Sequence, residues 1–153
     1  MRVHPDFTAT TFPLAVSAGT DITMHSSFLP SLGGVSWFVV LPDCDDARPI
    51  ADRLRDAADI REIRHRSDRP WILGNWSDEE VQSGDVDSMR ITAIGEHGLD
   101  RDSLRVPGEQ DAGCAHWVTS RDGMVNVRGT VSGLRRVFHA RIGGVRVAAA
   151  RAD

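Results

Sequence analysis

Apolar residues cluster most clearly near residue 35 and again after residue 115. Residues 1–34 mix Thr, Ser, Pro and Gly with isolated apolar residues, and neither the strand nor the helix period persists there. Residues 35–41 are apolar, β-branched and aromatic, which is typical of a buried strand, and Pro42 ends the run. We therefore expect a poorly patterned tail over 1–34 and one folded domain over 35–153. Met24 offers a second possible translation start.

A helix is predicted over residues 46–59. Asp45 or Asp46 can cap its amino end, and Pro49 suits its first turn. Apolar residues recur on one face of this segment, namely Ile50, Leu54, Ala57 and Ala58.

Weaker patterns follow this segment. Residues 60–66 alternate weakly, and the apolar cluster at 70–74 fits a short strand or a packed loop. Residues 86–94 indicate another strand, and residues 100–105 a brief helix.

Two β-hairpins are predicted near the carboxyl end. Residues 116–119 and 124–128 flank an Arg-Asp-Gly turn, and residues 135–141 and 145–149 flank Gly143-Gly144. We expect these four strands to form one antiparallel sheet. Because no covering helix follows the last strand, we also expect the domain to be incomplete at its C-terminus or to need a partner.

Composition narrows the class of protein. The 153 residues suit one domain, and 41% hydrophobic with 26% charged residues is ordinary for a globular chain. The net charge is −4 and acidic residues interleave with the arginines, which argues against a nucleic-acid partner. No signal peptide or membrane span is evident, so we expect a cytoplasmic protein without a membrane partner. All 18 basic residues are Arg, which excludes lysine chemistry.

The candidate reactive residues are few. Cys114 and His116 would lie on the same side of a strand, and they could form a thiol site or half of a metal site. No further ligand has a recognisable zinc spacing, so structural roles are favoured, and the same holds for His139. Trp71 and Trp76 could frame a peptide groove, although core packing is favoured. Two cysteines do not indicate a disulfide framework.

Several segments together resemble one family. Residues 128–140 read Arg-Gly-Thr-Val-Ser-Gly-Leu-Arg-Arg-Val-Phe-His-Ala, and residues 113–120 read Gly-Cys-Ala-His-Trp-Val-Thr-Ser. Residues 37–43, 69–76 and 150–153 add shorter matches. These segments resemble the N-terminal, glutaminase-like domain of actinobacterial lasso-peptide macrolactam cyclases, which are asparagine synthetase homologues. The resemblance spans about residues 35–153.

This resemblance implies a fold. It predicts an α+β sandwich of antiparallel sheets of the N-terminal-nucleophile type, like class II glutamine amidotransferases. In that family an Ala-Arg-Asp-x-x-Gly segment precedes Pro-Leu-Tyr-Tyr-Ala, which corresponds here to residues 127–133 and 136–140. We therefore expect residues 129–140 to lie in paired β-structure.

The chain departs from the glutaminases of that family at two positions. Their nucleophile is an N-terminal Cys directly ahead of the first strand, with its own α-amino group as the base, and no such Cys exists here. Ile94-Gly95-Glu96 resembles the family's Asn-Gly-Glu, but Ile94 lacks the side-chain donor that helps to stabilise the oxyanion. Loss of one such donor costs about 2.7–4 kcal/mol of transition-state stabilisation. We therefore expect no catalytic residues and no glutamine hydrolysis.

The chemistry of that family belongs to a C-terminal synthetase domain, which uses ATP and Mg²⁺ to activate a carboxylate of the precursor peptide. Its Ser-Gly-Gly-x-Asp-Ser loop is absent here. The Gly pairs in residues 31–34 and 142–144 fit turns better, so no cofactor or metal is expected in this chain. Implied partners are a synthetase domain or downstream polypeptide, a lasso precursor peptide and a leader peptidase.

Two alternatives remain open. The chain could be a free-standing module that binds a precursor peptide or a partner enzyme. It could also be a Cys-dependent leader peptidase, because His116-Trp117-Val118 resembles an Ala-His-x-Trp-Val segment of such enzymes. The order of Cys114 and His116 argues against this, and Cys44 is surrounded by acidic residues that would raise its pKa.

Overall fold

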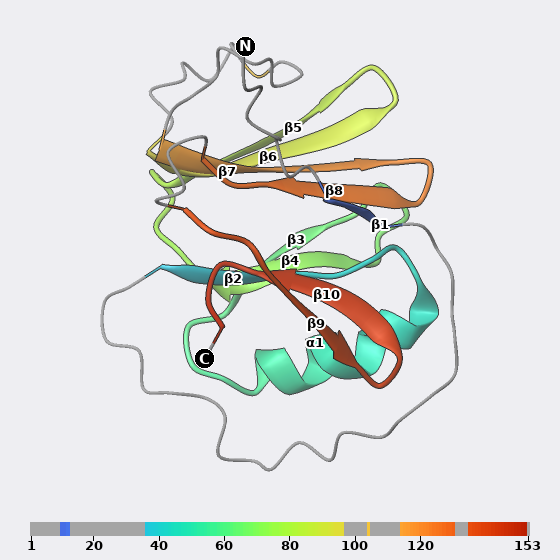
Figure 1. Ribbon diagram of the computed structural model, residues 1–153. Coiled ribbons are helices and arrows are strands. Elements are labelled where there is room, and N and C mark those ends of the chain that lie inside the picture. The colour runs from blue at the N-terminus through green and yellow to red at the C-terminus, as the bar shows by residue number, and fades with distance from the viewer. Residues whose placement is uncertain (1–9, 13–35, 97–103, 105–113, 131–134, 153) are drawn as a thin grey trace, which may run out of the picture.

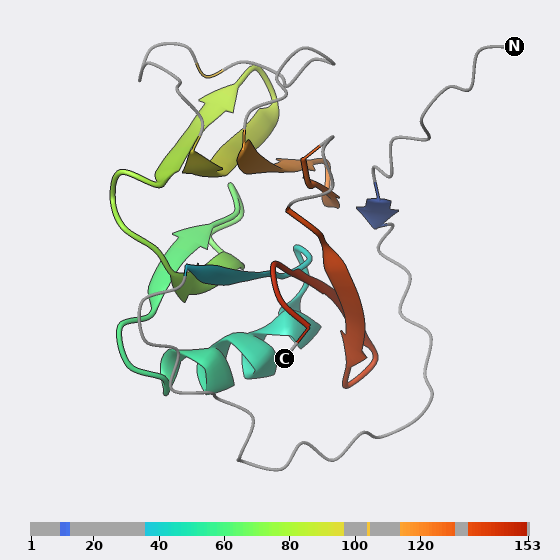
Figure 2. The same cartoon turned by 60° about the vertical axis from the view of Figure 1, so that its left-hand side comes forward.

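Two antiparallel sheets stack face to face, and one short helix covers the outer face of one of them (Figure 1). The computed structural model describes residues 10–12, 36–96, 104, 114–130 and 135–152. Within these residues the layers run helix, sheet, sheet, as Figure 2 shows from the side. The chain is therefore α+β, which confirms the coarse prediction of antiparallel sheets with a helix.

The sheet beside the helix, sheet B, has the strand order β3-β4-β2-β10-β9. Its strands are β2 (Trp37–Val40), β3 (Arg61–Arg64), β4 (Pro70–Asn75), β9 (Phe138–Ile142) and β10 (Val145–Ala149). The predicted apolar run around residue 37 forms the central strand, and the cluster at 70–74 forms a strand beside it. This arrangement fits their apolar composition, because strands inside a covered sheet are buried on both faces.

The other sheet, sheet A, has the order β1-β8-β7-β6-β5. Its strands are β1 (Thr10–Phe12), β5 (Val81–Val86), β6 (Met89–Glu96), β7 (Cys114–Arg121) and β8 (Met124–Arg128). Two of these strands, β1 and β5, were not predicted. The middle of β5 reads Gln-Ser-Gly-Asp, which carries no apolar alternation.

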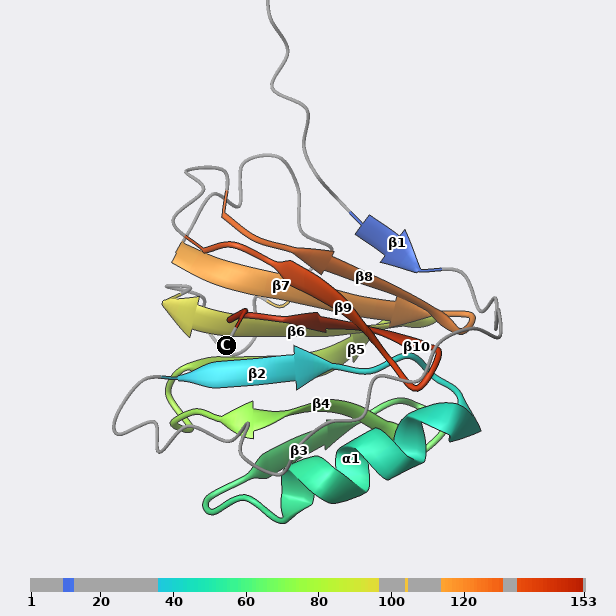
Figure 3. The ribbon, with the colours of Figure 1, turned by 60° about the horizontal axis from the view of Figure 1, so that its bottom comes forward.

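The helical segment is shorter than predicted. A 3₁₀ turn, η1 (Asp45–Ala47), leads into α1 (Arg48–Arg55), and Figure 3 shows α1 lying across sheet B. Neither predicted cap forms a side-chain hydrogen bond to the helix, because the carboxylate of Asp45 instead accepts a hydrogen bond from Nε of Arg69 at 2.9 Å. Ala58 is exposed beyond the helix, and Ala51 provides the fully buried alanine of the apolar face.

Both predicted hairpin turns are confirmed. Asp122 and Gly123 have φ of 50° and 77°, and Gly143 and Gly144 have φ of 54° and 83°. Two consecutive residues of positive φ give the turn that matches the twist of the flanking strands. The strands themselves pair as predicted, β7 with β8 and β9 with β10.

The prediction of one four-stranded sheet from these hairpins is wrong. β7 and β8 belong to sheet A, whereas β9 and β10 belong to sheet B. The chain crosses between the sheets after Arg128, so residues 129, 130 and 135–137 lie outside paired strands, and among the described residues of the expected segment 129–140 only 138–140 are paired. Hairpin periodicity is local and carries no information on which sheet each hairpin joins.

The main core lies between the two sheets. Strand alternation turns apolar residues of each sheet toward the other, and the sheets bury them almost completely. This cluster comprises Phe38, Val40, Trp71, Ile72, Trp76, Ile94, Val118, Val125, Val127 and Ala148.

Two smaller clusters flank this core. On the outer face of sheet B, Ala47 and Ala51 of the helical segment pack with Leu73, Val145 and Val147. On the outer face of sheet A, Ile91, Ala93 and Trp117 are buried, with Leu104 packed against them. The predicted helix over 100–105 and the Gly pair at 33–34 lie outside the described residues, apart from Leu104, which is not helical.

His65 links the two sheets through a buried polar contact. Its Nδ1 lies 2.9 Å from the hydroxyl of Ser120 in sheet A, and its Nε2 lies 3.1 Å from the carbonyl oxygen of Leu41 beside sheet B. The carbonyl can only accept, so Nε2 donates to it and Nδ1 accepts from Ser120. The ring is 2% exposed, and both nitrogens are satisfied within the chain.

Replacing His65 is therefore expected to weaken the stacking of the sheets. His65→Ala removes a buried ring and leaves the Ser120 hydroxyl and the Leu41 carbonyl without their partner, so the free energy of unfolding should fall by about 2–4 kcal/mol. Urea unfolding followed by tryptophan fluorescence measures this change. The exposed His139→Ala variant should lose less than about 1 kcal/mol, and equal losses in both variants would refute the role given to His65.

Stability should also fall on mild acidification. Burial holds the pKa of His65 and of His116 below the ordinary value of 6.5, so both rings are neutral in the folded chain. The unfolded chain takes up these protons below pH 6.5, so stability is full above that pH and falls as the pH drops toward the folded pKa values. Each ring contributes up to about 1.4 kcal/mol per pH unit in that window. A flat unfolding free energy between pH 7.5 and 5.5 would contradict this expectation.

Candidate functional site

A serine and a glutamate form a hydrogen-bonded pair at the amino end of β2. Ser36 precedes β2 there, and its hydroxyl lies 2.7 Å from each carboxylate oxygen of Glu80. The hydroxyl therefore donates to Glu80. Ser36 follows Val35 in the chain, so its nitrogen belongs to a peptide bond and is not a free amine.

Glu80 is fixed in this position by backbone groups. The backbone N–H of Ser77 donates to its carboxylate at 2.8 Å, and the backbone N–H of Gly95 donates to its carbonyl oxygen at 2.8 Å. The Ser77 and Ser36 hydrogen bonds, with a smaller contribution from the charge of Arg135, hold the pKa of Glu80 below its ordinary value. The site therefore carries a negative charge at neutral pH.

Ile94, where the resemblance predicts a missing side-chain donor, lies beside Glu80. Ile94 is 3% exposed and packs into the core between the sheets, and Gly95 adopts a φ of 116°, which favours glycine. The hydroxyl of Ser36 donates to the carboxylate of Glu80, and residue 94 provides no side-chain hydrogen-bond donor.

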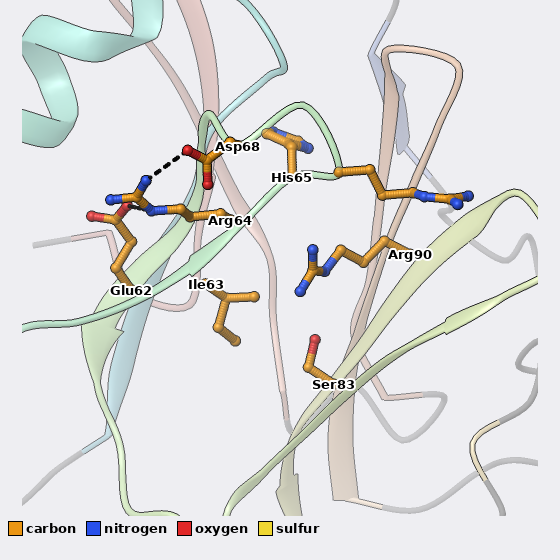
Figure 4. A pocket seen from close by; sticks show the side chains of 8 residues that line it. Glu62, Ile63, Arg64, His65, Asp68, Ser83 and Arg90 are labelled. Atoms are coloured by element: carbon orange, nitrogen blue, oxygen red, sulfur yellow. Dashed lines mark hydrogen bonds and ion pairs between the residues drawn. The ribbon is translucent and has the colours of Figure 1, made fainter.

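A groove runs along the edge of the sandwich where β3 of sheet B faces β5 of sheet A. It consists of one hollow of about 590 Å³ and an adjoining hollow of about 440 Å³. Both hollows are lined by Glu62, Ile63 and Ser83, so they lie next to each other along this edge. Figure 4 shows the larger hollow, which we call the cationic half.

Arginines dominate the cationic half, and most of them have acidic partners. Arg64 pairs with Glu62 at 3.0 Å and with Asp68 at 3.1 Å. Arg66 lies 3.7 Å from Asp85. Arg90 differs: within the described part of the chain its guanidinium forms no ion pair, and its Nε is buried without a hydrogen-bond partner.

Of the two predicted thiol candidates, only the side chain of Cys44 is described, and it is not an activated thiol. Cys44 lies in the loop between β2 and η1, half-buried, and burial raises its pKa, with a smaller contribution from the charge of Asp46. The expected direction is confirmed, although burial outweighs the acidic neighbours. A thiol with a raised pKa is a weak nucleophile at neutral pH.

The Cys114 and His116 pair lies on β7, as predicted, with the side chain of Cys114 outside the described atoms. His116 is buried, its Nε2 lies 3.1 Å from the carbonyl oxygen of Arg136, and its ring contacts Phe38 edge-on at 4.9 Å. This favours a structural role. No group of three His, Cys, Asp or Glu residues in the described part of the chain could hold a metal ion.

The remaining candidates divide between core and surface. Trp71 and Trp76 both pack in the core between the sheets, as favoured, and Trp76 also lines the smaller hollow. His139 lies exposed on the edge strand β9. The sequence did not single out Glu80, His65 or Arg90, because none of them belongs to a recognisable motif and their surroundings are set by residues distant in the sequence.

No model of a known protein family, no curated protein and no solved structure matches this chain. None of the described helices is both long and apolar enough to cross a membrane.

The Glu80 network yields a prediction about stability. Glu80→Gln removes the charge that strengthens the hydrogen bonds from Ser36 and Ser77, so unfolding should become easier by about 1 kcal/mol at pH 7 in this half-exposed site. The matched control is the exposed neighbour Glu79→Gln, which should have no measurable effect.

The pH dependence of stability shows whether the effect of Glu80→Gln comes from the lost charge or from a changed side-chain shape. The pKa of Glu80 is depressed, so its contribution is present above its ordinary value of 4.5 and is lost as the pH falls through the folded pKa. Glu80→Gln and the unmodified chain should therefore converge in stability at low pH. A difference that persists unchanged at pH 2.5 would contradict this origin.

Proposed function

We propose that the chain is a non-catalytic, glutaminase-like domain of an ATP-dependent, asparagine synthetase-like lasso-peptide macrolactam cyclase. In this role it supports isopeptide-bond formation by a synthetase domain or a separate synthetase polypeptide. Its fold would be a retained sandwich of the N-terminal-nucleophile type, and its location the cytoplasm.

The observation that carries this proposal is the Ser36–Glu80 pair at the amino end of β2. A glutaminase of the resembled family needs a thiol and a free amine at this place, whereas this chain has a hydroxyl, a peptide nitrogen and a carboxylate. The two-sheet α+β architecture supports the proposal by providing a β2 that is central in its sheet. A macrolactam cyclase requires no ammonia, since the nucleophile is the amine of the precursor peptide.

The Gly pair at 143–144 supports the proposal that a synthetase partner, and not this Gly pair, binds ATP. It forms the tight turn between β9 and β10 and is not followed by Asp-Ser, so it does not supply a pyrophosphate loop. ATP and Mg²⁺ would bind to the synthetase partner, which activates a carboxylate of the precursor.

The test combines this chain with an asparagine synthetase-like polypeptide and a lasso precursor peptide. We expect ATP-dependent loss of one water from the precursor, detected by mass spectrometry, and a much slower reaction without this chain. Ser36→Ala should leave the cyclisation rate within about twofold, because the hydroxyl stabilises only the local structure. Release of glutamate from glutamine by the purified chain would contradict the proposal, as would cyclisation that is indifferent to the chain.

The second candidate is a free-standing module that binds a precursor peptide or a partner enzyme. The groove between β3 and β5 favours it, because a groove bordered by two edge strands suits an extended chain. A neighbouring gene without the Ser-Gly-Gly-x-Asp-Ser loop would favour this candidate over the first. The leader-peptidase alternative receives no support from the half-buried Cys44 with its raised pKa.

A further inference from the structure

We infer that the groove between β3 and β5 binds an extended peptide segment through a carboxylate of that peptide, with Arg90 as its anchor. The inference depends on the groove alone, so it holds whether or not the proposed macrolactam function is correct.

Two edge strands border the groove. β3 stands at one end of sheet B and β5 at one end of sheet A, and neither has a second neighbouring strand among the described residues. The outer backbone N–H and C=O groups of each strand therefore pair with no strand in the part of the chain that the structure describes. An extended peptide can satisfy such groups by adding a strand, which is a common mode of peptide recognition.

Arg90 forms no ion pair with any described residue. Figure 4 shows its side chain extending from sheet A toward β3, with Ser83 and Ile63 bordering the same space. The other groove arginines are matched: Arg61 pairs with Asp78, Arg64 with Glu62 and Asp68, and Arg66 with Asp85. Asp85 lies opposite Arg90 in the β5–β6 ladder, but its carboxylate is directed to Arg66.

The buried Nε of Arg90, which has no hydrogen-bond partner among the described residues, indicates the kind of group that a ligand would supply. Burying a guanidinium N–H without an acceptor is unfavourable, and the described residues supply no acceptor to the Nε of Arg90. A carboxylate satisfies Nε together with a terminal nitrogen in a two-pronged, charge-assisted pair. The hydroxyl of Ser83 already lies 2.8 Å from that of Thr92 and borders the same hollow.

The adjoining hollow specifies a second feature of the peptide. Its walls include the partly buried apolar side chains of Ile63 and Val81, together with Trp76. An apolar side chain suits this half, whereas an acidic one suits the cationic half. Both would point to the same face of an extended peptide, so they are expected an even number of residues apart.

The test uses the full chain and a displayed library of random linear heptapeptides. We expect selected peptides to be enriched in Asp or Glu with an apolar residue at an even separation. Their synthetic forms, with capped termini, should perturb the backbone amide resonances of β3 and β5. Replacing the selected acidic residue by its amide should weaken binding about tenfold or more, because it removes the charge-assisted pair.

Variants of the chain test the anchor. Arg90→Gln should reduce affinity for the acidic peptide to that of its amide form, and Arg90→Lys should give an intermediate value because it keeps the charge and loses the two-pronged geometry. The matched control is Arg53→Gln on the exposed side of α1, which makes the same change of charge and should leave affinity within about twofold. Unchanged thermal unfolding shows that each variant is folded.

Three results would overturn the inference. They are a selection without acidic enrichment, amide perturbations confined to other strands, and equal affinity of the unmodified chain and Arg90→Gln for the acidic peptide. None of these readouts involves cyclisation or ATP, so this inference and the macrolactam proposal can fail separately.

Discussion

Sheet-on-sheet burial is the constraint on which every other feature of this chain depends. Strand alternation turns one face of each sheet toward the other, and Phe38, Trp71 and Val118 are almost completely buried there. The stacking brings Ser120 against His65, and it places the edges of β3 and β5 on either side of one groove. The same packing fixes Ile94 in the core, next to the backbone segment that holds Glu80.

Local signals predicted local structure well. The apolar run at β2, the cluster at β4 and both positive-φ turns are determined by neighbouring residues, and each is present. The β5 strand could not be predicted in this way, because Gln82, Ser83 and Asp85 give it a polar sequence. The division of the two hairpins between sheets depends on contacts distant in the sequence, so periodicity could not reveal it. The ion pair between Arg69 and the predicted cap residue Asp45 similarly joins residues distant in the sequence, so the pattern around the helix could not reveal it.

Only part of the candidate site could be predicted from the sequence. The resemblance to lasso-peptide cyclases predicted a missing thiol ahead of the first core strand and a missing donor at Ile94, and both follow from residue identity alone. The Ser36–Glu80 pair could not be predicted from the sequence, because the two residues are 44 positions apart and neither is unusual by itself. Arg90 was also invisible among 18 arginines, since its distinction is the absence of a partner that the other groove arginines possess. Such a distinction exists only once the strands are placed.

The charged carboxylate of Glu80 beside Ser36 is central to the proposed lack of glutaminase chemistry, because it places a fixed negative charge at the amino end of β2. The most direct measurement is an NMR titration of the Glu80 side-chain carboxyl carbon. The account predicts a pKa below the ordinary value of 4.5, and Ser36→Ala should move that pKa upward toward 4.5. A pKa of Glu80 at or above 4.5 in the unmodified chain, or one that Ser36→Ala leaves unchanged, would contradict it.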